Sequence, residues 1–170
     1  MSAAWQTWCG FSRTVLLSSC SGTVTRSGVQ VPTIAGNLRP ERIAYVAKCL
    51  SRNDTIKANK VLAPHQEPTW GDRQLVLDCA RHFNVGNVAS LELGLLLVTR
   101  APLDLRTVRN ATAHLSSSGL GEVRSLSSYY TGSSLRHPVE FLTWNENQTG
   151  DVAFNLWLTD LEECADYMTA

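Results

Sequence analysis

Residues 151–168 read DVAFNLWLTDLEECADYM, and their apolar side chains return every three or four positions. Because an α-helix completes one turn in about 3.6 residues, this spacing gathers the apolar side chains on one face of a long helix. The face consists of Phe154, Trp157, Leu158, Leu161, Ala165 and Met168. A helix of this kind favours an all-α fold, in which its apolar face packs against other helices.

Earlier segments show the same periodicity, with recognisable helix starts. Pro40 and Asp72 stand where helices begin, since proline suits the first helical turn and an aspartate side chain accepts hydrogen bonds from free amides. A third start lies at Pro102, and Gly119 and Gly121 are placed to end that helix. We therefore expect helices over residues 3–20, 40–50, 72–84, 88–98, 103–117 and 151–168.

Three segments lack the helical repeat. Residues 21–38 contain glycine, proline and β-branched residues, which favours a loop or a short hairpin. Two prolines within residues 53–70 rule out a continuous helix there. Within the irregular stretch 122–148, residues 139–144 favour a short strand.

The length of 170 residues is that of one ordinary domain, which can bury a core without disulfides or metals. We expect a single-domain helical bundle over residues 1–170, and no segment of it repeats. Its helical core covers about 1–20 and 39–168, and the irregular early loop or hairpin covers about 21–38.

The composition excludes several classes of protein. An apolar fraction of 44% and a charged fraction of 18% suit a soluble protein without membrane spans. The formal net charge of zero argues against a general nucleic-acid binder, so an RNA substrate would have to be gripped locally. Five widely spaced cysteines without a Cys-x-x-Cys pair predict neither disulfides nor a zinc site, and indicate a reducing cytoplasm.

No cofactor or metal site is expected. His65, His82 and His137 each stand apart from a second ligand at metal-binding spacing. The serine-rich stretches also lack the Gly-x-Ser-x-Gly context of a serine hydrolase.

The helix expected over residues 103–117 carries a polar ridge opposite its apolar face. The apolar face consists of Leu105, Val108, Thr112 and Leu115, and the ridge of Arg106, Arg109, Asn110, Ala113 and His114. Asn110 and His114 are one turn apart. Arg109 lies about 100° around the axis from Asn110, so only its long side chain can reach the same point.

These residue types suit the cleavage of a phosphodiester. Histidine titrates near neutral pH and can take a proton from a ribose 2′-hydroxyl or give one to the leaving 5′-oxygen. Arginine offers a permanently charged planar fork to the phosphate, and asparagine can orient a neighbouring group or donate to the phosphate. We therefore assign Arg109, Asn110 and His114 as candidate catalytic residues.

The string Arg109-Asn110-Ala111-Thr112-Ala113-His114 resembles the Arg-Asn-x-x-x-His signature of HEPN domains. The flanking residues, from Pro102 to Leu115, are similar to those of small stand-alone HEPN proteins of bacterial defence and toxin systems. The chain departs from one subgroup, because Ser116 stands where members modified on a tyrosine carry that tyrosine.

The resemblance implies a homodimer in which two motif helices face each other and build one composite RNase site. It implies a metal-independent endoribonuclease of phage defence or of a toxin–antitoxin or stress system, in which the RNA 2′-hydroxyl is the nucleophile. A regulatory or antitoxin protein is a further expected partner.

Other basic residues and other functions remain open. Arg100, Arg106 and Arg124 either extend an RNA-binding surface around the motif or carry ordinary surface charge. The alternatives to an enzyme are a non-catalytic HEPN module that dimerises or docks a partner, and an immunity or antitoxin protein. An enzyme needs Arg109 and His114 to converge across a dimer axis in a cleft open to solvent, whereas in a docking module they can be sealed under side chains.

Overall fold

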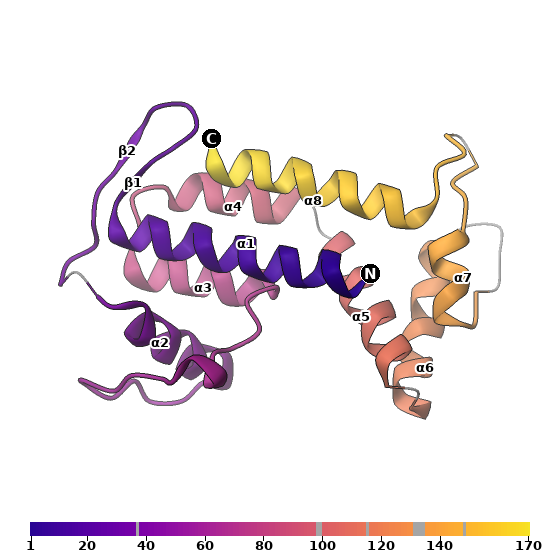
Figure 1. Cartoon of the computed structure of the whole chain (residues 1–170), viewed down its shortest axis with the longest axis horizontal. Coiled ribbons are helices and arrows are strands. Elements are labelled where there is room, and N and C mark those ends of the chain that lie inside the picture. The colour runs from indigo at the N-terminus through magenta and orange to yellow at the C-terminus, as the bar shows by residue number, and fades with distance from the viewer. Residues whose placement is uncertain (37, 98–99, 115, 131–134, 148) are drawn as a thin grey trace.

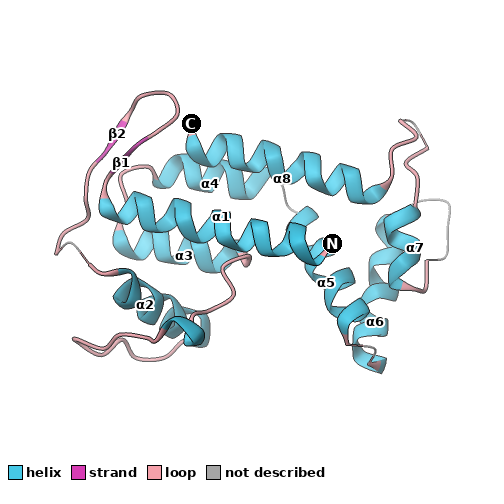
Figure 2. Cartoon of the chain, viewed as in Figure 1, coloured by secondary structure: helices cyan, strands magenta, loops and turns pink. Residues whose placement is uncertain are grey.

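The computed structural model describes residues 1–36, 38–97, 100–114, 116–130, 135–147 and 149–170. Helices dominate it, with one small two-stranded sheet (Figure 2), as expected for an all-α chain. The elements are α1 (Ser2–Ser21), β1 (Thr23–Val24), β2 (Gln30–Val31), α2 (Pro40–Arg52), the 3-10 helix η1 (Pro64–Gln66), α3 (Arg73–Phe83), α4 (Val88–Leu97), α5 (Ala101–Ala113), α6 (Ser117–Leu126), the 3-10 helix η2 (Ser127–Tyr129), α7 (Pro138–Thr143) and α8 (Ala153–Thr169).

Four helices form a bundle. Helix α1 packs against α3, α3 against α4, α4 against α8, and α8 against α1 (Figure 1). Helix α2 packs on the outside of α3, and α5 leads from the bundle to α6 and α7. Fully buried apolar side chains from these helices form the core, among them Leu16, Ile43, Val76, Leu91, Leu105, Phe141 and Met168.

Most of the expected elements are confirmed. Asp72 caps α3, because its side chain accepts hydrogen bonds from the amides of Gln74 and Leu75. The segment after α1 forms a hairpin in which Thr23 pairs with Val31. Among the described helices, none combines the length and the apolar character that crossing a membrane requires.

The expected helix over residues 103–117 is too long at its C-terminal end. Helix α5 stops at Ala113, and His114 has already left helical geometry, with φ −135° and ψ 87°. Ser116 then starts α6, since its hydroxyl accepts a hydrogen bond from the amide of Gly119 at 3.0 Å. Gly119 and Gly121 therefore lie inside α6 and do not end the preceding helix.

The expected apolar face of this helix is confirmed in part. Leu105 and Val108 are fully buried. Thr112 is exposed, and its hydroxyl donates back to the carbonyl oxygen of Val108. Leu115 lies outside the described residues.

The strand expected at residues 139–144 is wrong, because residues 139–143 lie in α7 and Trp144 directly follows its last residue. Pro138 occupies the first helical turn, and His137 and Glu140 form a capping box around it. The buried Phe141 then packs edge to face against Tyr130, with ring centroids 5.1 Å apart. These start signals and the burial of one aromatic ring outweigh the strand propensity of the segment.

Candidate functional site

The polar ridge of α5 faces solvent, as its spacing predicts. Arg106 and Arg109 are half-buried, whereas Asn110 and His114 are exposed. The opposite side of α5 contributes Leu105, Val108 and Ala111 to the core. Burial of that face fixes the rotation of the helix and therefore the direction of the ridge.

Arg109 and Asn110 lie in direct contact. The Nη1 atom of Arg109 donates a hydrogen bond to Oδ1 of Asn110 at 2.8 Å. The Nε atom of Arg109 is buried and has no hydrogen-bond partner among the described residues. Arg109 as a whole is only half-buried, so its charged guanidinium can still meet a further acceptor such as a phosphate oxygen from the solvent side.

Helix α1 lies close to this arginine. Burial raises the pKa of the Cys9 thiol, whereas the backbone of Gly71 and, to a smaller degree, the charge of Arg109 lower it in part. Gly71 allows α1 to pack closely against the segment before α3, because a Cβ there would stand 2.5 Å from the Trp5 ring and 2.8 Å from Sγ of Cys9. Trp8 adds a hydrogen bond between α1 and this segment, since its indole N–H donates to the carbonyl oxygen of Gly71 at 3.1 Å.

Arg109 and Asn110 line a pocket of about 680 Å³, which we name the α5 pocket. Its charged and polar walls come from α2, η1 and α5, and include Lys48, Arg52, His65, Arg106, Arg109 and Asn110. Arg52, His65 and Asn110 are exposed, so solvent and solutes reach the pocket. Its volume matches that of ordinary small-ligand sites, which is sufficient for a nucleotide.

The two carboxylates of the α5 pocket are both paired with arginine. Glu67 accepts hydrogen bonds from Nε and Nη2 of Arg13 at 2.6 and 2.8 Å, and the lowered pKa of its carboxyl follows mainly from Arg13. Asp72 pairs with Arg106 at 3.3 Å. The charges of Lys48, Arg52 and Arg109 are thus left without a carboxylate partner, which favours an anionic ligand.

His114 lies one turn beyond Asn110, at the C-terminal end of α5. Its backbone N–H donates to the carbonyl oxygen of Asn110 at 2.8 Å. Its imidazole is exposed and makes no hydrogen bond or ion pair with any described residue, and His114 is not part of the pocket wall. The structure therefore brings Arg109 and Asn110 together in the pocket wall and leaves His114 exposed outside it.

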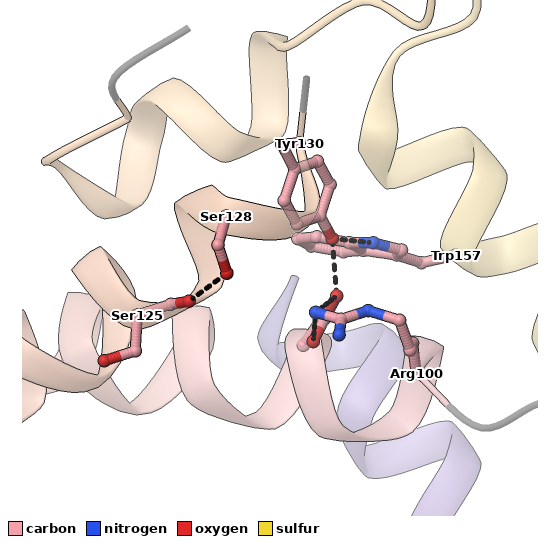
Figure 3. A network of polar contacts seen from close by, with 6 residues as sticks. Arg100, Ser125, Ser128, Tyr130 and Trp157 are labelled. Atoms are coloured by element: carbon pink, nitrogen blue, oxygen red, sulfur yellow. Dashed lines mark hydrogen bonds and ion pairs between the residues drawn. The ribbon is translucent and has the colours of Figure 1, made fainter. Parts of the chain in front are cut away.

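Arg100 takes part in a separate, largely internal network (Figure 3). Its Nη2 atom donates to both carboxylate oxygens of the buried Asp104 at 3.0 Å, and its guanidinium stacks 3.4 Å from the centre of the Tyr129 ring. The Tyr130 hydroxyl donates to Asp104 at 2.6 Å and accepts from Trp157 at 2.9 Å. The charge of Arg100 is thus already compensated inside the protein.

Burial dominates the titration of this network. Desolvation raises the pKa of Asp104, although Tyr130 and Arg100 lower it in part. Desolvation also raises the pKa of Tyr130, with Asp104 adding to the effect. The network joins the start of α5 to η2 and α8, so it holds these three elements together.

The two other arginines expected to bind RNA, Arg106 and Arg124, lie in different places. Arg106 lines the α5 pocket beside Arg109, whereas Arg124 is exposed on α6 and lies outside the pocket wall. Sequence reasoning missed Lys48, Arg52 and His65. The spacing of Lys48 and Arg52, one turn apart on α2, was a readable signal, but no sequence pattern shows which helix that face meets.

Within the described ranges, no three His, Cys, Asp or Glu residues come together in a way that would hold a metal ion. No protein-family model, curated protein or solved structure matches this chain. Its function is therefore inferred from the chemistry of the α5 ridge and pocket.

Proposed function

We propose that this protein is a metal-independent endoribonuclease of the HEPN type, with Arg109, Asn110 and His114 as its catalytic set. One observation carries the proposal: Arg109 and Asn110 are hydrogen-bonded to each other in an open pocket with an excess of positive charge. His114 stands exposed one turn further along the same ridge. A module that used the motif only for packing would bury these side chains, whereas here Asn110 and His114 are exposed and Arg109 is half-buried.

The reaction is an internal transfer at phosphorus. The ribose 2′-oxygen attacks the adjacent phosphorus, and an imidazole takes the 2′-hydroxyl proton. The bond from phosphorus to the 5′-oxygen breaks, and that oxygen receives a proton from a protonated imidazole. Arg109 stabilises the extra negative charge on the phosphate oxygens. The products are a 2′,3′-cyclic phosphate and a 5′-hydroxyl.

Two proton-transfer groups are needed, and each chain supplies His114 at an exposed rim. A homodimer with the two α5 ridges apposed provides one imidazole as base and the other as acid. The exposure of His114 and Asn110 suits such an apposition. A monomeric mass at micromolar concentration, with cleavage retained, would contradict the composite site.

The test uses total RNA and a defined oligonucleotide in an excess of EDTA. We expect cleavage of the RNA, 2′,3′-cyclic phosphate ends on the products, and no cleavage of the same oligonucleotide carrying 2′-deoxyribose at the cut position. Cleavage that requires a divalent ion, or equal cleavage of the deoxy substrate, would overturn the mechanism. If RNA stays intact under all conditions, a docking role replaces the enzyme.

We propose that the protein acts in the cytoplasm, in phage defence or in a toxin–antitoxin or stress system. A regulatory or antitoxin protein would then control access to the ridge. The exposure of Asn110 and His114 supports this, because a partner that covers the ridge would block the substrate. Protection of His114 from chemical modification by a co-expressed neighbouring gene product would test it.

A further inference from the structure

A second pocket lies beside the α5 pocket, and residues of α2 line both of them. The second pocket has a volume of about 440 Å³ and shares Lys48 and Arg52 with the first. Lys57 and Lys60, from the loop after α2, line its far side. All three lysines of the chain therefore lie along this second pocket.

Positive charge is concentrated along the two pockets. Six cationic side chains line them, namely Lys48, Arg52, Lys57, Lys60, Arg106 and Arg109. Three carboxylates line them as well. Asp72 is paired with Arg106, so this pair cancels, and Glu67 is paired with Arg13 from outside the two pockets, which leaves five cations against Asp54. In a chain with zero formal net charge, this local excess marks a site for a polyanion.

The loop that carries Lys57 and Lys60 is held in place by α2. The Nη1 atom of Arg42 donates to the carbonyl oxygens of Lys57 and Lys60 at 2.7 and 3.0 Å. The backbone N–H of Lys57 donates to the Tyr45 hydroxyl at 3.2 Å. Both lysine side chains are exposed, and their ammonium groups form no ion pair with any described residue. The loop is thus fixed by its backbone while its charges stay free.

We infer that the two pockets form one track for the phosphate backbone of single-stranded RNA, leading from Lys57 and Lys60 over Lys48 and Arg52 to Arg109. The inference rests on the proposed function, because Arg109 is the point at which the strand would be cut. A row of cations along the two pockets suits a single strand, because its flexible backbone can follow them. The track would let a protein without net charge bind RNA through a local excess of positive charge.

Binding is measured in the His114→Ala background, so that the RNA stays intact, with a fluorescent single-stranded RNA of about 15 nucleotides at several salt concentrations. Lys57→Ala combined with Lys60→Ala removes two track charges. The matched control combines Arg26→Ala with Arg136→Ala, which also removes two exposed charges but lies outside both pockets. Thermal unfolding of each variant shows that it remains folded.

We expect the track variant to bind roughly tenfold more weakly at low salt. The slope of log affinity against log salt should fall by about 1.4, since each contact between a cation and a single-strand phosphate contributes about 0.7. The control should change neither quantity. An unchanged affinity and slope in the track variant, or an equal loss in the control, would overturn the track.

The two proposals fail in different ways. If the wild type does not cut RNA but the track variant loses RNA binding, the RNA track is supported and the proposed nuclease activity is wrong. If the wild type cuts RNA and the track variant binds RNA as tightly as the control, the nuclease activity is supported and the RNA track is wrong.

Discussion

Arg109 donates a hydrogen bond from Nη1 to Oδ1 of Asn110 at 2.8 Å, although neighbouring residues on a helix point about 100° apart. The long arginine side chain bends across the ridge to make this contact. Asn110 therefore acts on Arg109 first, by holding its guanidinium at the pocket wall. This relationship predicts different roles for the two residues.

Replacing Arg109 by alanine should lower the rate of RNA cleavage by about 10² to 10³ fold, because the pocket loses the donor that stabilises the transition-state charge. Arg109→Lys should restore only part of the rate, since an ammonium lacks the planar fork. Initial rates at saturating RNA measure both effects. If Arg109→Ala unfolds the protein outright, the residue has a structural role.

Asn110→Ala should cost less, about tenfold in rate, because a residue that orients a catalytic group contributes less than the group itself. The loss should appear in kcat more than in KM, since the phosphate-binding cations remain. A loss as large as that of Arg109→Ala would show that Asn110 touches the phosphate directly.

Much of the fold could be predicted from local signals. Asp72 caps α3, Pro40 opens α2, and the apolar face of α8 is recognisable in the sequence, because each depends on residues within one or two turns. The C-terminal residue of α5 is not predictable in this way, because a signal that starts a helix and signals that end one lie close together there. Ser116 begins a new helix before the glycines can end the old one.

The site could be predicted only on one helix. The α5 ridge follows from spacing alone, and the structure leaves Asn110 and His114 exposed and Arg109 half-buried. The opposite wall of the α5 pocket, with Lys48, Arg52 and His65, depends on how α2 and η1 pack in three dimensions. No local pattern encodes that contact, so the cations of this wall cannot be located from the sequence.

The packing of α4 against α8 predicts a large effect for one glycine. A Cβ at Gly94 would stand 2.7 Å from Cγ of Met168 and 2.8 Å from the carbonyl oxygen of Cys164. Gly94→Ala should therefore lower the free energy of unfolding by about 1 to 3 kcal/mol, because the helices must move apart. Urea unfolding followed by circular dichroism measures the change.

Gly10, in the middle of α1, is the matched control. A Cβ there meets no described atom within 4 Å. Gly10→Ala should raise the free energy of unfolding by about 0.5 to 1 kcal/mol, since alanine restricts the unfolded chain and favours the helix. Equal effects at both glycines would contradict the described contact between α4 and α8.

The Arg13–Glu67 pair predicts a pH-dependent contribution to stability. The pKa of Glu67 is lowered from 4.5, first by the hydrogen bonds from Arg13 and then by that from Trp70. The stabilisation is therefore complete above about pH 4.5 and is lost as the pH falls through the lowered value. Glu67→Gln should cost about 1 kcal/mol at pH 7, because Arg13 is partly exposed and solvent screens the pair.

This cost should shrink as the pH falls below 4.5, where the wild-type carboxyl becomes protonated as well. Parallel urea titrations of wild type and Glu67→Gln between pH 3 and pH 7 measure the difference. A difference that stays constant across this range would show that the ion pair does not stabilise the folded state.

The most direct test of the catalytic assignment is the rate of RNA cleavage by His114→Ala relative to wild type, in an excess of EDTA. The His114 side chain is exposed and forms no hydrogen bond or ion pair with described residues, so its removal should leave the unfolding transition unchanged. We predict a rate lower by about 10² to 10³ fold, because both copies lose their proton-transfer group. Cleavage by His114→Ala at the wild-type rate would contradict the assignment and leave the ridge without a catalytic role.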